Sequence, residues 1–146
     1  MMTEEMDRPR ILRAIKKCLD NSDEFFKKAM DAVDEIGKGS LGAGMTPLIG
    51  GYGMKDPKSN YRGALFEIDS AERALKPLMI RYKDGRVNAS HFKSERAMII
   101  LQDIEGMNYS ILIRKLMEQS GRESIWYILR DQRMKIKELL TLIVDL

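Results

Sequence analysis

Apolar residues recur at helical spacing in the N-terminal part of the chain. They are separated by alternating steps of four and three residues, and only Ser22 interrupts the series with a polar side chain. This spacing predicts an amphipathic helix that begins near Pro9 and ends at Gly37. Residues 20–23 are its weak point, because Asp, Asn and Ser favour helix caps over helix interiors. The stripe consists of Ile11, Ile15, Cys18, Ser22, Phe25, Ala29, Ala32 and Ile36, flanked by Leu12, Leu19, Phe26, Met30 and Val33.

Glycine separates this helix from the rest of the chain. Eight of the eleven glycines lie between residues 37 and 63, interleaved with apolar residues and two prolines. A purely solvated tether has little use for apolar side chains, so we expect a partly packed loop. The predicted organisation is a long N-terminal helix over residues 1–36, a Gly-rich connector over 37–63 and a helical domain over 64–146.

The helical pattern resumes at Ala64 and reaches Tyr82, with Pro77 predicting a kink or an end. Residues 78–91 allow two interpretations, a helix that ends at Gly85 or a small β-hairpin that turns there. Further apolar series, divided by glycines near residues 106 and 121, predict additional helices. The last of these series repeats at Ile125, Leu129, Gln132, Ile136, Leu139, Ile143 and Leu146. The chain is thus predicted to be mainly α, a bundle of four to six helices.

Composition narrows the possible chemistry. A single cysteine, Cys18, cannot form an internal disulfide, and with His91 as the only histidine a zinc site of Cys and His ligands is excluded. The N-terminus lacks the apolar core of a signal peptide, and the apolar runs are too short to cross a bilayer. We therefore expect a cytoplasmic protein with no membrane contact, no metal and no cofactor.

Charge is unevenly distributed along the chain, although the net charge is only +3. Residues 37–96 carry eleven basic and six acidic side chains, whereas residues 1–36 carry seven basic and nine acidic ones. Clustered Lys and Arg raise the local concentration of anions, so a basic middle segment is compatible with a phosphate-bearing partner. Ordinary fluctuation of charge along a sequence explains the same counts.

Residues 97–133 carry the most extended resemblance to a known family. A helix, the phrase Asn108-Tyr109-Ser110, a second helix, a Ser-Gly turn and a third helix follow one another. This order resembles the trihelical core of helix-turn-helix DNA-binding proteins of winged-helix type. The resemblance implies that the third helix enters the DNA major groove, with Ile125, Trp126 and Leu129 packed inward. It implies DNA contacts by Arg122, Tyr127, Arg130 and Arg133, and we add Lys38, Lys55, Lys58 and Arg62 as supporting contacts to the phosphate backbone.

Three weaker motifs point to other activities. Gly37-Lys38-Gly39-Ser40-Leu41-Gly42 matches a dinucleotide-binding fingerprint, but no predicted strand precedes it, so we interpret it as a hinge or an anion-binding loop. Arg86 and His91 have the Arg-x4-His spacing that resembles the motif of HEPN ribonucleases. Asp31 with Asp34, and Asp69 with Glu72, resemble in spacing the acidic pairs of all-α nucleotide pyrophosphatases.

The sequence therefore favours a non-catalytic nucleic-acid-binding protein, a small regulator, over the alternatives. The first alternative is a structural or assembly protein whose helical faces bind a protein partner. The lesser alternative is a HEPN-like ribonuclease or an all-α nucleotide pyrophosphatase. The long apolar stripes also predict a homodimer, with residues 11–36 and 136–146 as its candidate contacts.

Overall fold

The computed structural model describes the backbone of residues 2–42, 57–117 and 122–145, and within these ranges the side chains of residues 7–35, 62–112, 114 and 124–145. Apart from its helices, this part of the chain contains one isolated antiparallel bridge, between Phe92 and Ile143. The predicted mainly α class is therefore confirmed. The elements are α1 (Met2–Gly42), α3 (Pro57–Lys83), the short 3₁₀ helix η1 (Ala89–His91), α4 (Arg96–Glu105), α5 (Tyr109–Met117) and α6 (Arg122–Leu142).

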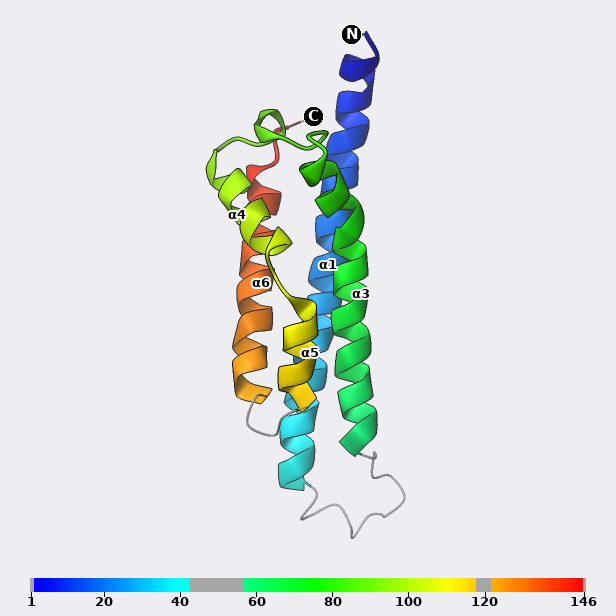
Figure 1. Ribbon diagram of the computed structural model, residues 1–146, viewed down its shortest axis with the longest axis vertical. Coiled ribbons are helices and arrows are strands. Elements are labelled where there is room, and N and C mark those ends of the chain that lie inside the picture. Colours follow the sequence, from blue (N-terminus) through cyan, green and yellow to red (C-terminus); the bar gives the residue numbers. More distant parts are fainter. Residues whose placement is uncertain (1, 43–56, 118–121, 146) are drawn as a thin grey trace.

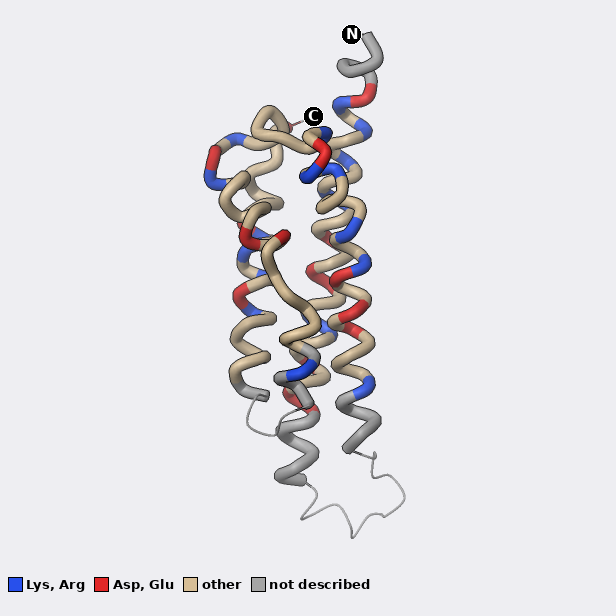
Figure 2. Tube along the Cα trace, in the orientation of Figure 1, with Lys and Arg blue, Asp and Glu red and all other residues tan. Residues whose placement is uncertain are grey.

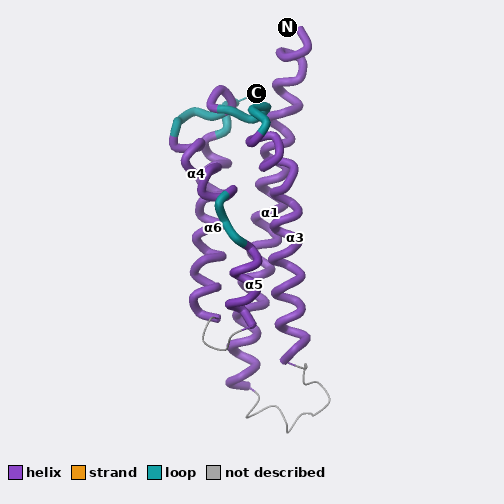
Figure 3. Tube along the Cα trace, viewed as in Figure 1, coloured by secondary structure: helices purple, strands orange, loops and turns teal. Residues whose placement is uncertain are grey.

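The helices form an elongated up-and-down bundle (Figure 1). Helix α1 packs between α3 and α6, and α3 and α6 each also contact α4 and α5. Helices α4 and α5 follow one another along the same side of the bundle, so they act as one interrupted helix opposite α1 (Figures 1 and 3). The arrangement is a four-helix bundle whose third member is broken.

Helix α1 is longer than predicted, and a different set of its residues forms the core. It runs through Gly37 to Gly42, so the GxGxxG segment is helical and does not form the predicted loop. Residues 20–23 do not divide it either, because the buried Ser22 hydroxyl donates a 3.0 Å hydrogen bond to the carbonyl oxygen of Leu19. The flanking series that includes Leu12, Leu19 and Phe26 is buried, whereas Ile11, Cys18 and Phe25 are only partly buried.

Helix α3 continues through Pro77 and ends in a glycine turn. Because Pro77 lies on an exposed face, water can replace the backbone N–H donor that this residue lacks. Gly85 has a φ of 84°, in the left-handed region. Glycine adopts this conformation without the steric cost that other residues have, and it commonly ends a helix in this way. The helical interpretation of residues 78–85 is therefore confirmed, and the predicted hairpin is wrong.

The core runs the length of the bundle and includes the inner face of α6. The predicted α6 series is confirmed as far as Leu139, since Ile125, Leu129, Gln132, Ile136 and Leu139 are all 0% exposed. Ile143 is only partly buried and follows the end of α6, and Leu146 lies outside the described residues. At one end, two backbone hydrogen bonds tie the chain after α6 to the α3–α4 connection, from Lys93 N to Leu142 O (2.6 Å) and from Val144 N to His91 O (3.0 Å). The remaining buried apolar residues come mainly from α3, α4 and α5, including Ala64, Ile68, Ala71, Leu75, Leu78, Ala97, Ile100, Leu101, Ile104 and Leu112.

The stripes predicted as homodimer contacts are used inside one chain. In residues 11–36, the broad apolar face packs against α3 and α6. In residues 136–146, Ile136 and Leu139 are fully buried in the same core. A dimer formed through the buried part of these faces would have to open the bundle, and the homodimer itself stays a prediction.

Candidate functional site

The predicted nucleic-acid contacts on α6 divide into an exposed pair and an internal residue. Tyr127 is 51% exposed and Arg130 is exposed beside it. The Arg130 guanidinium lies 5.6 Å from the ring centroid of Tyr127 and 5.9 Å from that of Trp126, within the range of cation–π attraction. Arg133 instead pairs with Asp23 of α1, with 2.9 Å between Nε and Oδ1 and 3.4 Å between Nη2 and Oδ2. Arg133 therefore belongs to the packing between α1 and α6 and not to an open basic surface.

The other predicted contacts do not extend this pair into a site. Arg62 is exposed on α3. Lys38, Lys58 and Arg122 lie in α1, α3 and α6, but their side chains are outside the described residues, and Lys55 lies outside them altogether. Within the described part of the chain, the structure thus brings together only Tyr127 and Arg130 of the predicted set.

The helices of the predicted helix-turn-helix segment are present as α4, α5 and α6. Ile125 and Leu129 are buried and Trp126 is partly buried, as the winged-helix resemblance implies. Helix α6 extends to Leu142 and packs along α1 as well as α4 and α5. Its inner face is therefore committed to a four-helix core.

A strongly basic surface occurs elsewhere, at the end of the bundle that holds the first turns of α1 and the α3–α4 connection. Residues 7–17 carry five basic side chains and one acidic one, and residues 81–96 carry five basic and two acidic ones. These segments lie at the same end of the bundle, where Lys and Arg gather in Figure 2, and Arg8 Nη2 donates to Ser90 O across them (2.7 Å). We call this surface the basic end, defined by Arg8, Arg10, Arg13, Lys16, Lys17, Arg81, Lys83, Arg86, Lys93 and Arg96.

The two halves of the basic end differ in how far their charges are neutralised. In residues 81–96, acidic side chains lie close to several of the cations, for example Asp84 beside Arg86 (2.7 Å) and Glu105 beside Lys83 (2.8 Å). On α1, the exposed Arg10, Arg13, Lys16 and Lys17 form no ion pair with any described side chain. The open positive charge is therefore concentrated on residues 10–17 of α1.

The HEPN-like pair of Arg86 and His91 lines a cleft of about 600 Å³ at this end, together with Arg8. His91 is 5% exposed, and its Nδ1 accepts a 3.2 Å hydrogen bond from the backbone N–H of Asn88. Burial, aided by the charge of Arg8, lowers the pKa of His91, so the neutral ring with its proton on Nε2 is favoured. In that tautomer neither ring nitrogen is free to accept a proton, and the geometry gives His91 a capping role at η1.

A shallow apolar groove of about 480 Å³ separates α5 from α6. Ile111 is 46% exposed and Tyr127 51% exposed along its walls. Gln132 also lines it, although its side chain is fully buried and both amide atoms lack a hydrogen-bond partner among the described residues. The groove combines exposed apolar surface with a polar group that the bundle leaves unsatisfied.

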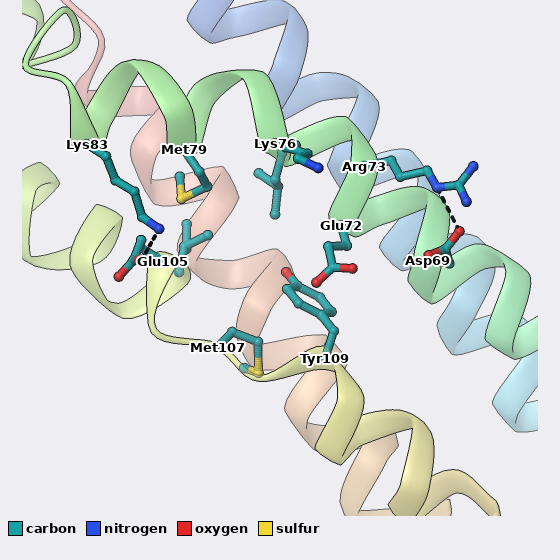
Figure 4. Close-up of a pocket in the computed structure, with 11 residues that line it drawn as sticks. Asp69, Glu72, Arg73, Lys76, Met79, Lys83, Glu105, Met107 and Tyr109 are labelled. Carbon is teal, nitrogen blue, oxygen red and sulfur yellow. Dashed lines mark ion pairs between the residues drawn. The ribbon is translucent and has the colours of Figure 1, made fainter.

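A third cleft, of about 370 Å³, opens between α3 and the junction of α4 with α5 (Figure 4). Its wall contains both acidic residues of the predicted metal pair on α3, Asp69 and Glu72, but also cationic side chains. The Arg73 Nε lies 2.9 Å from an Asp69 carboxylate oxygen, and Lys76 is one turn away. Cations already occupy the neighbourhood of these carboxylates, so the arrangement does not resemble an open magnesium site.

Other classes of assignment find no support in the described residues. They contain no group of three or more His, Cys, Asp or Glu side chains able to hold a metal ion. No helix within them has both the length and the apolar character needed to cross a membrane. No protein-family model, curated protein or solved structure matches the chain.

Proposed function

We propose that this protein is a non-catalytic nucleic-acid-binding protein that contacts the phosphate backbone through its basic end. The observation that supports the proposal is the set of exposed cations Arg10, Arg13, Lys16 and Lys17 on α1, which lie at the same end of the bundle as the basic α3–α4 connection. Electrostatic attraction of this kind supplies most of the affinity of sequence-independent nucleic-acid binding. The phosphate contacts proposed here therefore differ from those that the winged-helix resemblance implies.

The spacing of the α1 cations supports a polyanionic partner. Arg10, Arg13 and Lys17 follow one another at intervals of three and four residues, so they lie on one exposed helix face. Like charges at these spacings repel and destabilise a helix by a few tenths of a kcal/mol per pair. A row of phosphates would relieve this repulsion.

Binding to a labelled duplex of mixed sequence, measured by fluorescence anisotropy over a range of salt concentrations, tests the proposal. If about four cations each neutralise a phosphate, log K should fall with log salt with a slope of about −3.6 for DNA. The double substitution Arg13→Glu with Lys17→Glu should weaken binding at least tenfold at low salt and reduce the slope by about 2.

The matched control is Lys27→Glu with Lys28→Glu, which makes the same change in net charge on an exposed part of the same helix. Its affinity should stay within about threefold of the unmodified protein, because those residues lie outside the basic end. An equal loss of affinity in both double variants would show that the duplex is attracted by the net charge of the protein alone. Loss only in Arg130→Glu would place the contact on α6, and no binding to DNA or RNA at low salt would remove the proposal.

A second candidate function is the binding of an amphipathic helix from a protein partner in the groove between α5 and α6. It is supported by the exposed apolar side chains of Ile111 and Tyr127, with Arg130 and Trp126 nearby, since Trp, Tyr and Arg dominate interface energetics. Arg114 of α5 and Arg130 of α6 are exposed on the two helices that form the groove, which favours a partner helix with acidic flanks.

The substitution Ile111→Asp separates this candidate from the first. It should abolish co-purification of a stoichiometric partner and leave the salt-dependent binding of nucleic acid unchanged, because Ile111 lies outside the basic end. Nucleic-acid binding that fails in Ile111→Asp, with the fold intact by circular dichroism, would contradict the separation of the two surfaces.

A further inference from the structure

The cleft between α3 and the α4–α5 junction has the features of a small-molecule site, and it shares only Lys83 with the basic end. It exists because α4 ends at Glu105 and α5 begins at Tyr109, so the interrupted helix leaves a gap in the wall of the bundle. Its apolar lining includes the thioether side chains of Met79 and Met107. Methionine adapts its shape to a ligand more readily than branched side chains do, and clefts between bundle helices are common ligand sites.

Tyr109 lines this cleft and holds an unsatisfied hydroxyl buried just beneath its surface. The residue is 7% exposed, its ring stacks on Phe26 with 6.3 Å between centroids, and its hydroxyl has no hydrogen-bond partner among the described residues. Burial, reinforced by the negative charge of Glu72, holds the pKa of the Tyr109 hydroxyl far above its ordinary value. The hydroxyl therefore stays neutral at physiological pH, able both to donate and to accept a hydrogen bond.

Among the charged side chains that line the cleft, one anion and one cation have no ion-pair partner among the described residues. Four of the six form two ion pairs, Asp69 with Arg73 at 2.9 Å and Glu105 with Lys83 at 2.8 Å. Glu72 and Lys76 remain without an ion pair among the described residues, one helical turn apart on α3. Figure 4 shows the Glu72 carboxylate beside the ring of Tyr109, with Lys76 further along the same helix.

We propose that this cleft binds a free α-amino acid with an apolar side chain. Its ammonium group would donate to the Glu72 carboxylate and the Tyr109 hydroxyl oxygen, and its carboxylate would accept from the Lys76 ammonium. Its side chain would lie between Met79 and Met107. A zwitterion satisfies both unmatched charges at once, whereas a simple cation or anion satisfies only one.

Three probes of nearly equal shape test this assignment on the full chain: L-leucine, 3-methylbutan-1-amine, which lacks the carboxylate, and 4-methylpentanoate, which lacks the ammonium. Binding is followed by ¹H–¹⁵N NMR titration up to about 10 mM, which detects affinities in the millimolar range. L-leucine should shift amide signals around residues 72–79 and 104–109, and each truncated probe should bind roughly tenfold more weakly.

Substitutions identify which charge each end of the ligand contacts. Glu72→Gln should weaken the binding of L-leucine and of the amine about tenfold and leave binding of the acid unchanged. Lys76→Gln should weaken the binding of L-leucine and of the acid about tenfold and leave binding of the amine unchanged. Asp69→Asn with Arg73→Gln is the matched control, since it removes a paired anion and cation from the same helix. No shift with L-leucine, equal binding of all three probes, or insensitivity to Glu72→Gln would overturn the assignment. The result of this titration does not depend on whether the protein binds nucleic acid, because none of the substituted residues belongs to the α1 part of the basic end.

Discussion

Replacing Gln132 by methionine should stabilise the protein, although it removes a polar side chain from a natural core. Gln132 is 0% exposed, and both its amide nitrogen and its amide oxygen lack partners among the described residues. An unsatisfied buried polar group costs about 1–3 kcal/mol. Methionine has similar length and helix propensity, so the exchange removes this cost with little change in packing. We expect a gain of about 1–3 kcal/mol in the free energy of unfolding.

Urea unfolding followed by circular dichroism measures this gain directly. The midpoint should rise while the dependence of the free energy on urea concentration stays unchanged, because the surface exposed on unfolding is nearly the same. In thermal unfolding, a domain of this size gains about 2–4 °C per kcal/mol, so the melting temperature should increase by roughly 2–12 °C.

Leu129→Met, one turn earlier in α6 and equally buried, is the control for introducing methionine. A volume-conserving exchange between apolar residues typically costs less than about 1.5 kcal/mol. If Gln132→Met destabilised the protein by more than Leu129→Met does, the amide would have to be satisfied in the folded state. A water reaching it from the α5–α6 groove would do so, and the reasoning about its cost would be refuted.

Three further predictions test other parts of the fold. Gly85→Ala should cost about 1 kcal/mol because φ is positive there, whereas Gly106→Ala should change the free energy of unfolding by less than about 0.5 kcal/mol, since its φ is −77°. Because burial lowers the pKa of His91, this histidine is protonated at a higher pH in the unfolded chain than in the folded one. The free energy of unfolding, relative to that of His91→Gln, should therefore fall as pH decreases through about 6.5. Urea midpoints measured on both sides of that pH check this. A double-mutant cycle of Asp23→Ala with Arg133→Ala should give a coupling free energy of about 1 kcal/mol, because both side chains of this ion pair are only 21% exposed. A coupling near zero would contradict a structural role for the pair.

The apolar periodicity was sufficient to predict the class of fold and most of the core. In α6 it identified the buried residues from Ile125 to Leu139, because a helix that buries one face has a sequence period that matches its geometry. In α1 it identified the helix but not the orientation of its face. Helix α1 packs against two neighbours, α3 and α6, so its apolar face is wide and the stripe with the best spacing is not the most buried one.

Local signals misplaced the helix boundaries. Gly37 and Pro77 favour a helix end, yet α1 and α3 continue past them. At Pro77 the exposed position keeps the cost of the missing N–H donor low. Gly85 did end its helix, because there the chain takes the positive φ that glycine supplies at little cost.

The candidate surfaces depended on tertiary structure that the sequence does not reveal. Counting charge over residues 1–36 combined the basic first turns of α1 with its acidic continuation, so the basic end was missed; a window over residues 7–17 would have shown it. The pairing of Asp23 with Arg133 joins residues far apart in the chain. Likewise, the cleft beside Tyr109 exists only because α3 lies across from the α4–α5 junction.

The distribution of charge along α1 also limits how a polyanion can lie on the protein. Residues 7–17 are mostly basic, whereas residues 20–35 carry six acidic side chains and two basic ones. The acidic stretch repels phosphates, so a polyanion should cross α1 near its N-terminal end and not follow the helix along its length. The α5–α6 groove lies outside the basic end and would stay accessible to a second molecule.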